Sequence, residues 1–410
     1  MKQKKALFSL LLIIVISPLN SFESQFSFGL ENIPDNFVKK IKNARIALIT
    51  NQTGKDQHGR RNIDILRDKG LNLKAILVPE HGLDGKIVAG KETPNSIDKK
   101  TRIKIISLYQ QGHGKEITKN MIDDFDILIF DIQDSGTRHY TYISTMFDTL
   151  NAAAQFDKYY IILDRPNPLG LCMEGPIVED NLRSFVSIAP IPLRHAMTVG
   201  ELGWFFNKHI LEKPAKLHVI KMKGYERTHG LKNTPFNTLS PNISSLKSCH
   251  GYSFLGLLSA IHPFDVGLKT DNAFQIILLP ERISLSQKEW YKLQHLLKTH
   301  KIESVPYKRY HKKNKEMYTG LKLTVHEINK THSFTVALDI IDFFKKSGTK
   351  MSFAPIFDKL TGTKSVRHYI EGSINRITLS KQINESLNNF LSKADSSFMY
   401  KPEPHVAVLR

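Results

Sequence analysis

Residues 75–82 read Ala-Ile-Leu-Val-Pro-Glu-His-Gly, a short apolar run that ends in a proline, a glutamate and a histidine. Similar apolar runs, each followed by polar residues, cover residues 46–50, 105–109, 127–130 and 160–163. Helix-like segments separate these runs. Short apolar strands that alternate with helices predict an α/β domain whose parallel sheet is covered on both faces.

Four of these runs end in polar side chains that can carry chemistry: Asn51, Glu80, Asp131 and Asp164. The carboxyl ends of parallel strands meet at one edge of the sheet, and ligands bind outside that edge. One such ending carries little weight, because loops after strands are commonly polar. Four together predict a functional site at this edge.

The chain has 410 residues, enough for two domains of ordinary size. Residues 233–250 are rich in Asn, Ser and Pro and predict a linker between domains at residues 25–232 and 251–410. The second part predicts a smaller α+β domain, with strands near 274–279 and 321–325 and helices near 290–299, 335–345 and 381–394.

The N-terminus is typical of a secretory signal peptide. Lys2, Lys4 and Lys5 precede an apolar stretch at residues 6–16, which is shorter than the ~20 residues of a membrane span. We predict a signal peptide over residues 1–21 and a periplasmic or secreted protein with no membrane span after its removal. An uncleaved N-terminal anchor is the alternative.

The net charge of the chain indicates which kinds of binding partner it favours. The formal net charge of +19 favours polyanionic surroundings. For an exported protein these are acidic envelope polymers and carboxylate-bearing wall fragments rather than nucleic acid.

Cys172 and Cys249 are the only cysteines, and they either form one disulfide or remain two buried thiols.

Several cofactor motifs are missing. Gly112 and Gly114 lack the third glycine of a dinucleotide loop, and no phosphate-binding loop, HExxH motif or Gly-x-Ser-x-Gly elbow occurs. The 17 histidines show no spacing typical of metal ligands. We therefore predict neither a cofactor nor a metal.

Glu80 is the strongest candidate for a general acid. Burial at a sheet edge raises the pKa of a carboxyl group, and the acid that cleaves a glycosidic bond needs such a raised pKa. His81 could orient it or contact a sugar. The alternative is that Glu80 caps a helix or forms a salt bridge.

Two further segments suit a carbohydrate site, which needs paired hydrogen bonds and aromatic rings. The first supplies Asp131, Gln133, Asp134, Arg138, Tyr140 and Tyr142, although both aspartates could instead cap the following helix. The second supplies Asp164, Arg165 and Asn167 in a proline-stiffened loop, where an Asp–Arg pair could simply hold a turn.

Later positions divide into ligand candidates and a helix cap. Glu174, Arg194 and His195 are candidates, since a guanidinium binds a carboxylate through two hydrogen bonds. Thr198-Val199-Gly200-Glu201 is a capping-box pattern, so Glu201 is expected to be structural.

Taken in order, these segments resemble the exo-β-N-acetylmuramidases of glycoside hydrolase family 171, formerly a domain of unknown function. The motifs that carry the resemblance lie at residues 49–54, 60–66, 79–85, 107–109, 130–145, 163–168, 174–176, 190–198 and 240–242. They span nearly the whole mature chain.

The resemblance implies a Rossmann-like domain without a nucleotide, a smaller C-terminal domain and an active site between them. It also implies hydrolysis that releases MurNAc from the non-reducing end of peptidoglycan-derived muropeptides or disaccharides. Glu80 matches the family's leading catalytic candidate. We take Asp131 as the second catalytic carboxylate, with Glu174 as second choice. The lactyl carboxylate of MurNAc would give Arg138, Arg165 or Arg194 a partner, and Asn242 of the linker joins the substrate contacts.

One departure from the family pattern keeps a second function open. Family members commonly carry Gly-Thr-Asn-x-Ser-Glu-Gly-Arg-Gly after the Ser-Pro-Asn motif, whereas residues 255–267 here lack that Glu and Arg. The alternative is therefore a catalytically weakened protein that binds wall sugar on the same fold.

Overall fold

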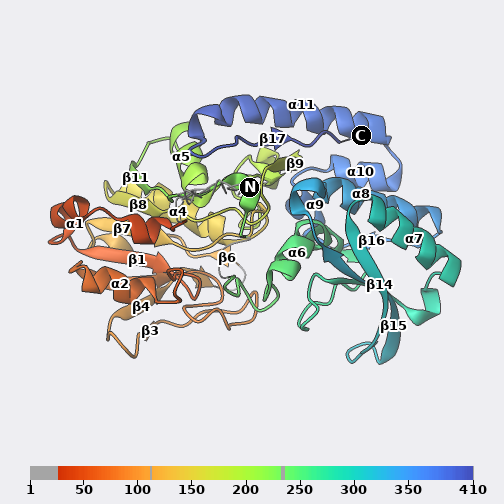
Figure 1. Cartoon of the computed structure of the whole chain (residues 1–410), viewed down its shortest axis with the longest axis horizontal. Coiled ribbons are helices and arrows are strands. Elements are labelled where there is room, and N and C mark those ends of the chain that lie inside the picture. The colour runs from red at the N-terminus through yellow and green to blue at the C-terminus, as the bar shows by residue number, and fades with distance from the viewer. Residues whose placement is uncertain (1–25, 111–112, 232–235, 410) are drawn as a thin grey trace, which may run out of the picture.

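The computed structural model describes residues 26–110, 113–231 and 236–409. The predicted signal peptide at residues 1–21 lies outside these described residues. Figure 1 shows two lobes side by side, with α11 (Arg376–Ala394) running across the top of both.

The first lobe is built on a sheet with the strand order β11-β8-β7-β1-β2-β4-β3. Its parallel strands are β1 (Ile46–Thr50), β2 (Leu73–Val78), β4 (Lys104–Ser107), β7 (Ile127–Asp131), β8 (Tyr159–Leu163) and β11 (Lys216–Ile220). The edge strand β3 (Ser96–Ile97) pairs with β4 in the antiparallel direction. This is the Rossmann order, in which the direction of winding reverses between the first strand, β1, and the fourth parallel strand, β7. The predicted Rossmann-like sheet is confirmed.

Alternate residues of β1 enter two different cores, because side chains point to opposite faces of a strand in turn. Ala47 and Ile49 join the core beneath α4 (Tyr142–Gln155) and α5 (Val199–His209). Ile46 and Leu48 join the core shared with α1 (Asp35–Ile41) and α2 (Asn62–Asp68). Burial on both faces explains why the strand sequence is continuously apolar. A short α3 (Lys119–Ile122) precedes β7.

The second lobe contains an antiparallel sheet in the order β13-β15-β14. The strands of this sheet are β13 (Ile276–Pro280), β14 (Ile302–His311) and β15 (Glu316–Val325). The helices of the lobe are α6 (Leu246–Leu258), α7 (Gln287–Thr299), α8 (Ser333–Lys346), α9 (Phe357–Thr361) and α10 (Ser365–Glu371). The smaller α+β character is confirmed. The edge strand β14 was not expected, because only Ile302 of its residues is buried and the strand has no continuous apolar run. Helix α6 begins inside the predicted linker, where Ser245 forms a capping box with Ser248.

The C-terminal segment ties the lobes together. Strand β17 (His405–Val406) pairs with β9 (Cys172–Ile177), which also pairs with β10 (Pro192–Arg194). The two cysteines are buried free thiols, so the alternative of a disulfide is not realised. The Cys172 thiol instead lies 3.4 Å from the carbonyl oxygen of Asn329.

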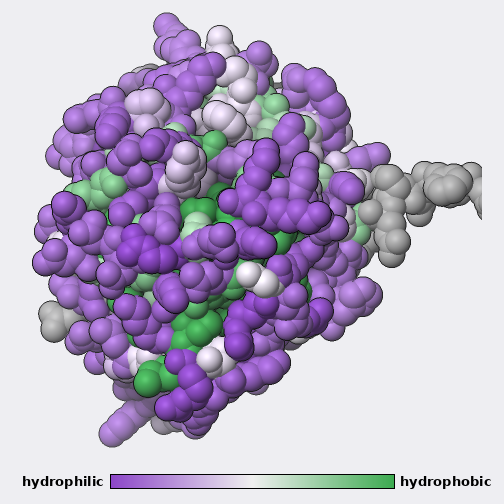
Figure 2. All heavy atoms as spheres, turned by 90° about the vertical axis from the view of Figure 1, so that its left-hand side faces the viewer, coloured by the Kyte–Doolittle hydropathy of each residue, from purple (hydrophilic) through white to green (hydrophobic). Residues whose placement is uncertain are grey.

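The amino ends of the strands carry an apolar groove of about 840 Å³ between α1, β8, α5 and β11. Phe37, Tyr159 and Trp204 are among its lining residues. Figure 2 looks onto this side of the molecule and shows apolar side chains among a hydrophilic surface. Within the described ranges, no helix has the length and apolar character needed to cross a membrane.

Candidate active site

The predicted convergence of strand ends is confirmed by the sheet order. Strands β2, β1, β7 and β8 are consecutive neighbours, so Glu80, Asn51, Asp131 and Asp164 lie along one edge. All four side chains are buried. The hydrogen bonds and ion pairs of each side chain show whether it holds the fold together or remains available to a ligand.

Glu80 is held by neutral donors on both oxygens. The Thr141 hydroxyl donates to Oε2 at 2.8 Å, and the Gly90 amide donates to Oε1 at 2.9 Å. His81 follows with a φ of 72°, a left-handed conformation that non-glycine residues rarely adopt and that often marks functional turns. No lysine or arginine in the described residues pairs with Glu80, so the salt-bridge alternative is not realised.

A cluster of tyrosines surrounds this carboxylate. The rings of Tyr140 and Tyr142 lie 4.6 Å apart, and Tyr252 of α6 lies 6.0 Å from Tyr140. Tyr140 and Tyr142 each donate their hydroxyl to the Leu239 carbonyl at 2.9 Å. Burial raises the pKa of all three phenols, which therefore stay protonated. Because Tyr252 comes from the second lobe, the cluster lies where the lobes meet.

Five side chains in this neighbourhood have buried polar atoms without a hydrogen-bond partner among the described residues: Asn51 Nδ2, Gln52 Oε1, Asp134 Oδ1, His195 Nε2 and both ring nitrogens of His139. Asn51 and Gln52 lie near the Tyr142 hydroxyl, and the His139 ring is 4.6 Å from that of Tyr252. An unpaired buried polar group costs about 1–3 kcal/mol. Their concentration at one place indicates a binding site whose ligand supplies the partners.

Asp134 is a fixed carboxylate with one available oxygen. Its Oδ2 accepts the Gly136 amide at 2.6 Å and lies 3.3 Å from His195 Nε2. His195 Nδ1 accepts the Met197 amide at 3.2 Å, which places the imidazole proton on Nε2, facing Asp134. Asp134 does not cap α4, which begins at Tyr142. Tyr252 is within electrostatic reach of both Asp134 and Glu80, so both carboxylates flank the tyrosine cluster.

Asp131 is held in a buried ion pair. Its Oδ1 pairs with Arg165 Nε at 2.5 Å, and its Oδ2 accepts Asn62 Nδ2 at 2.8 Å. The Arg165 guanidinium also stacks over Phe28 at 4.8 Å. These groups lie at the β1–β7 switch point and are fully buried. The contacts favour a structural role for both Asp131 and Arg165 over the catalytic and substrate-binding roles expected from the sequence.

Asp164 anchors the start of α5. It accepts hydrogen bonds from the Thr198 hydroxyl at 2.9 Å, the Gly200 amide at 2.8 Å and the Tyr400 hydroxyl at 2.6 Å. Burial raises the pKa of Asp164 to about 6. The expected capping box of Thr198 and Glu201 is confirmed.

The other two candidate arginines connect the lobes. All five N–H groups of Arg138 are engaged, by the Ser187 hydroxyl and by the carbonyls of Pro176, Ile191, Leu360 and Thr361. Arg194 pairs with Glu174 at 2.5 Å, and the Glu174 carboxylate accepts the Ser333 and Phe334 amides at the start of α8. Arg138 therefore has no N–H group left to bind a substrate carboxylate, and Glu174 caps the start of α8.

Three remaining candidates hold loops in place. Gln133 donates to the carbonyls of Asp134 at 2.9 Å and Pro166 at 2.7 Å. Asn167 donates to the Met197 carbonyl at 2.9 Å. Asn242 accepts the Lys269 amide at 2.8 Å and so joins the linker to the segment just after the residues that depart from the family pattern.

Sequence reasoning missed Thr141, Gly90, His139 and Tyr252. Thr141 lies inside the Tyr-Thr-Tyr motif and could have been found there. Tyr252 carries no local signal, because only the packing of α6 brings it to Glu80. No group of three or more His, Cys, Asp or Glu side chains suited to a metal ion occurs in the part of the chain that the structure describes.

Comparison with known proteins identifies the family of this chain. Models of the N-terminal and C-terminal regions of the exo-β-N-acetylmuramidase NamZ match residues 46–247 and 250–400. The chain is 33% identical to the peptidoglycan β-N-acetylmuramidase NamZ of Bacillus subtilis over 380 residues, which cover 91% of each protein.

Two crystal structures of DUF1343 family proteins from Bacteroides fragilis have the same fold. One has a TM-score of 0.82 at 28% identity and covers 92% of this chain and 99% of its own. The other has a TM-score of 0.72 at 27% identity and covers 93% of this chain and 99% of its own. The chain therefore belongs to the NamZ exo-β-N-acetylmuramidase family.

Proposed function

We propose that this protein is an exo-acting β-N-acetylmuramidase that releases MurNAc from the non-reducing end of peptidoglycan fragments. Family membership supports a glycoside hydrolase that acts on peptidoglycan. The observation that carries the proposal is the Glu80 carboxylate, oriented by Thr141 and Gly90 and surrounded by tyrosines and unpartnered polar groups. The basic N-terminal sequence supports export to the periplasm or the medium.

In this mechanism Glu80 is the general acid. Its proton passes to the glycosidic oxygen as the bond from that oxygen to the anomeric carbon breaks. The tyrosine rings contact the faces of the sugar. Burial of the site strengthens each hydrogen bond to the substrate, because few water molecules compete.

Asp134 is the better candidate for the second carboxylate than Asp131. Glycosidases need a carboxylate that faces the anomeric carbon, as nucleophile or as base for water. Asp134 keeps Oδ1 free among the described residues, whereas Asp131 is held in a buried ion pair with Arg165 and accepts a further hydrogen bond from Asn62. The Gly136 amide, which donates to Asp134 Oδ2, then orients this carboxylate, and His195 Nε2 lies 3.3 Å from the same oxygen.

The lactyl carboxylate of MurNAc needs donors other than the three expected arginines. Arg138 and Arg165 are buried in hydrogen-bond networks, and Arg194 is paired with Glu174. Asn51 Nδ2 and the ring nitrogen of neutral His139 that carries the hydrogen are unpartnered donors in the cluster. We assign the recognition of the carboxylate or the acetamido group to these two side chains.

The test is hydrolysis of a chromogenic β-MurNAc glycoside and of MurNAc-terminated fragments by the protein without its leader. Wild type should release MurNAc, and Glu80→Gln should reduce kcat by about a thousandfold, since general acid catalysis contributes about 10²–10⁴-fold. Release that persists in Glu80→Gln would reject the assignment of the acid. Binding of fragments without release by wild type would instead support the weakened sugar-binding protein, which the missing Glu–Arg stretch favours.

A further inference from the structure

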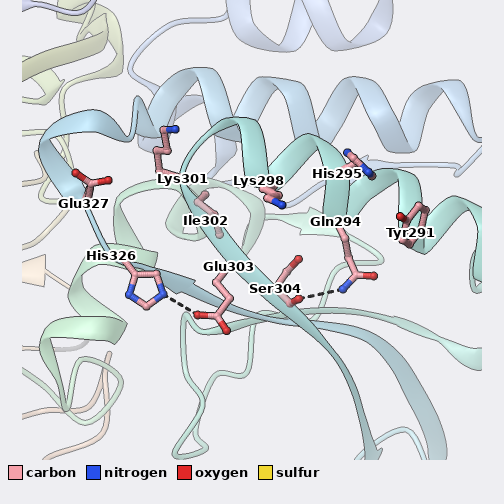
Figure 3. A pocket seen from close by; sticks show the side chains of 10 residues that line it. All are labelled: Tyr291, Gln294, His295, Lys298, Lys301, Ile302, Glu303, Ser304, His326 and Glu327. Carbon is pink, nitrogen blue, oxygen red and sulfur yellow. Dashed lines mark hydrogen bonds and ion pairs between the residues drawn. The ribbon is translucent and has the colours of Figure 1, made fainter.

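A pocket of about 560 Å³ opens in the second lobe between α7 and β14 (Figure 3). Tyr291, Gln294, His295 and Lys298 are three or four residues apart and so share one face of α7. The opposite wall comes from the start of β14 and from His326 and Glu327, which follow β15. All the lining residues belong to the second lobe, whereas Glu80 follows a strand of the first.

This face of α7 is not needed for packing. The core face of the helix carries Leu293 and Leu297, both with an exposed fraction of 0%. Tyr291, in contrast, is 63% exposed, although its ring lies edge-on to His295 at 5.3 Å. A large aromatic ring left exposed beside polar groups is a typical platform for the apolar face of a sugar ring.

The pocket and its immediate surroundings carry more positive than negative charge. Glu303 is paired with His326 at 2.7 Å, as the dashed line in Figure 3 shows, and Glu327 is paired with Lys330 at 2.6 Å. Lys298 and Lys301 are exposed, and neither forms an ion pair with another of the described residues. With Lys330 included, three ammonium groups face two carboxylates, and this excess of positive charge favours an anionic ligand.

One polar group of the pocket is held in place. Gln294 Nε2 donates to the Ser304 carbonyl of the edge strand β14 at 2.9 Å (Figure 3). This hydrogen bond fixes the amide plane and leaves the Gln294 side-chain oxygen as an acceptor for a hydroxyl. The pocket thus combines an aromatic platform, an oriented amide and two cations within a volume in the usual range for small ligands, roughly 300–1,000 Å³.

We propose that this pocket is a second glycan-binding site, which takes a carboxylate-bearing amino sugar of a peptidoglycan strand. Lys298 and Lys301 contact the carboxylate, Tyr291 stacks on the sugar, and Gln294 accepts a hydroxyl. The pocket holds the polymer while the Glu80 site acts on a chain end. The substrate class rests on the proposed function, whereas the anionic character of the ligand rests on the pocket alone.

The test compares binding with hydrolysis. Binding to insoluble sacculi, freed of phosphate-containing polymers, is measured by co-sedimentation in a Glu80→Gln background, so that the polymer is not digested. The variants are Lys298→Glu with Lys301→Glu, and Tyr291→Ala. The charge-matched control is Lys312→Glu with Lys313→Glu, in the exposed turn between β14 and β15. Hydrolysis of the small chromogenic glycoside is measured with Glu80 intact.

Both pocket variants should weaken binding to sacculi by about fivefold or more, as expected when contacts worth about 1 kcal/mol are lost. The control should change binding by less than about twofold, and neither double variant should change kcat/KM on the small glycoside. If the two double variants lost the same amount of binding, the effect would come from net charge alone, and the proposal would be overturned. Unchanged binding in the pocket variants would also overturn it. Absence of hydrolysis by wild type would reject the proposed function, while co-sedimentation would still decide on the pocket.

Discussion

Thr141 donates its hydroxyl to Oε2 of Glu80 across 2.8 Å, although the two residues lie 61 positions apart in the chain. Thr141 is the N-cap residue of α4, and α4 is packed into the larger core of the sheet. The orientation of the proposed acid therefore depends on a helix that follows a different strand from its own.

Removing this hydroxyl should affect turnover rather than substrate binding. Thr141→Val keeps the side-chain shape but leaves Glu80 Oε2 without its donor, so we expect kcat to fall by about tenfold with KM nearly unchanged. Thr141→Ser restores the donor and should recover most of the loss. A purely structural role would be revealed if Thr141→Ser and Thr141→Val had the same kcat, measured on the chromogenic glycoside.

The two aspartates at the carboxyl end of β7, Asp131 and Asp134, should respond to substitution in opposite ways. Asp134→Asn removes the charge that faces the ligand and should reduce kcat by at least about a hundredfold with little change in the free energy of unfolding. Asp131→Asn leaves Arg165 buried without its partner and should lower the free energy of unfolding by about 3–5 kcal/mol. Urea unfolding and initial rates on the same preparations separate the two effects. Loss of stability in Asp134→Asn would contradict its assignment.

Arg138 should matter for stability and not for substrate affinity. Arg138→Lys has three N–H donors in place of five and leaves buried carbonyls of both lobes unpaired. We expect a loss of about 3 kcal/mol or more in the free energy of unfolding, with an unchanged KM. Arg183→Lys, at an exposed ion pair, is the matched control and should change stability by less than about 0.5 kcal/mol. A raised KM in Arg138→Lys would contradict this assignment and indicate that Arg138 contacts the substrate.

Asp148 of α4 should make stability depend on pH. Burial raises its pKa from the ordinary 3.8 to about 6, so the folded state binds its proton more tightly than the unfolded state. This contribution to stability is complete below about pH 4 and is lost as the pH rises through about 6.

Asp148→Asn removes the titrating group. The variant should be more stable than wild type by roughly 1–3 kcal/mol near pH 7.5, and equally stable near pH 4. Urea unfolding at both pH values is the measurement, and Asp180→Asn, at an exposed position, is the control. A constant difference between Asp148→Asn and wild type across this range would contradict the assignment.

The sequence predicted the sheet because local patterns encode it. Apolar runs at residues 46–50, 75–78, 127–130 and 160–163 correspond to β1, β2, β7 and β8, since strands covered on both faces must be continuously apolar. The capping box at Thr198 was equally readable, because its partners lie within three residues. Strand β14 was missed because an exposed edge strand needs few apolar residues.

The sequence by itself determined which polar groups reach the edge of the sheet, because the end of each strand is a local feature. Only the tertiary structure decided which of them remain available. Asp131 and Asp134 both lie at the carboxyl end of β7 and look alike in the sequence. Asp131, however, pairs with Arg165, 34 positions later, and accepts a hydrogen bond from Asn62, 69 positions earlier. Asp134 keeps one oxygen free among the described residues. Ion pairs and hydrogen bonds act over a few ångströms in space, so distance along the chain does not show whether a buried charge is already paired.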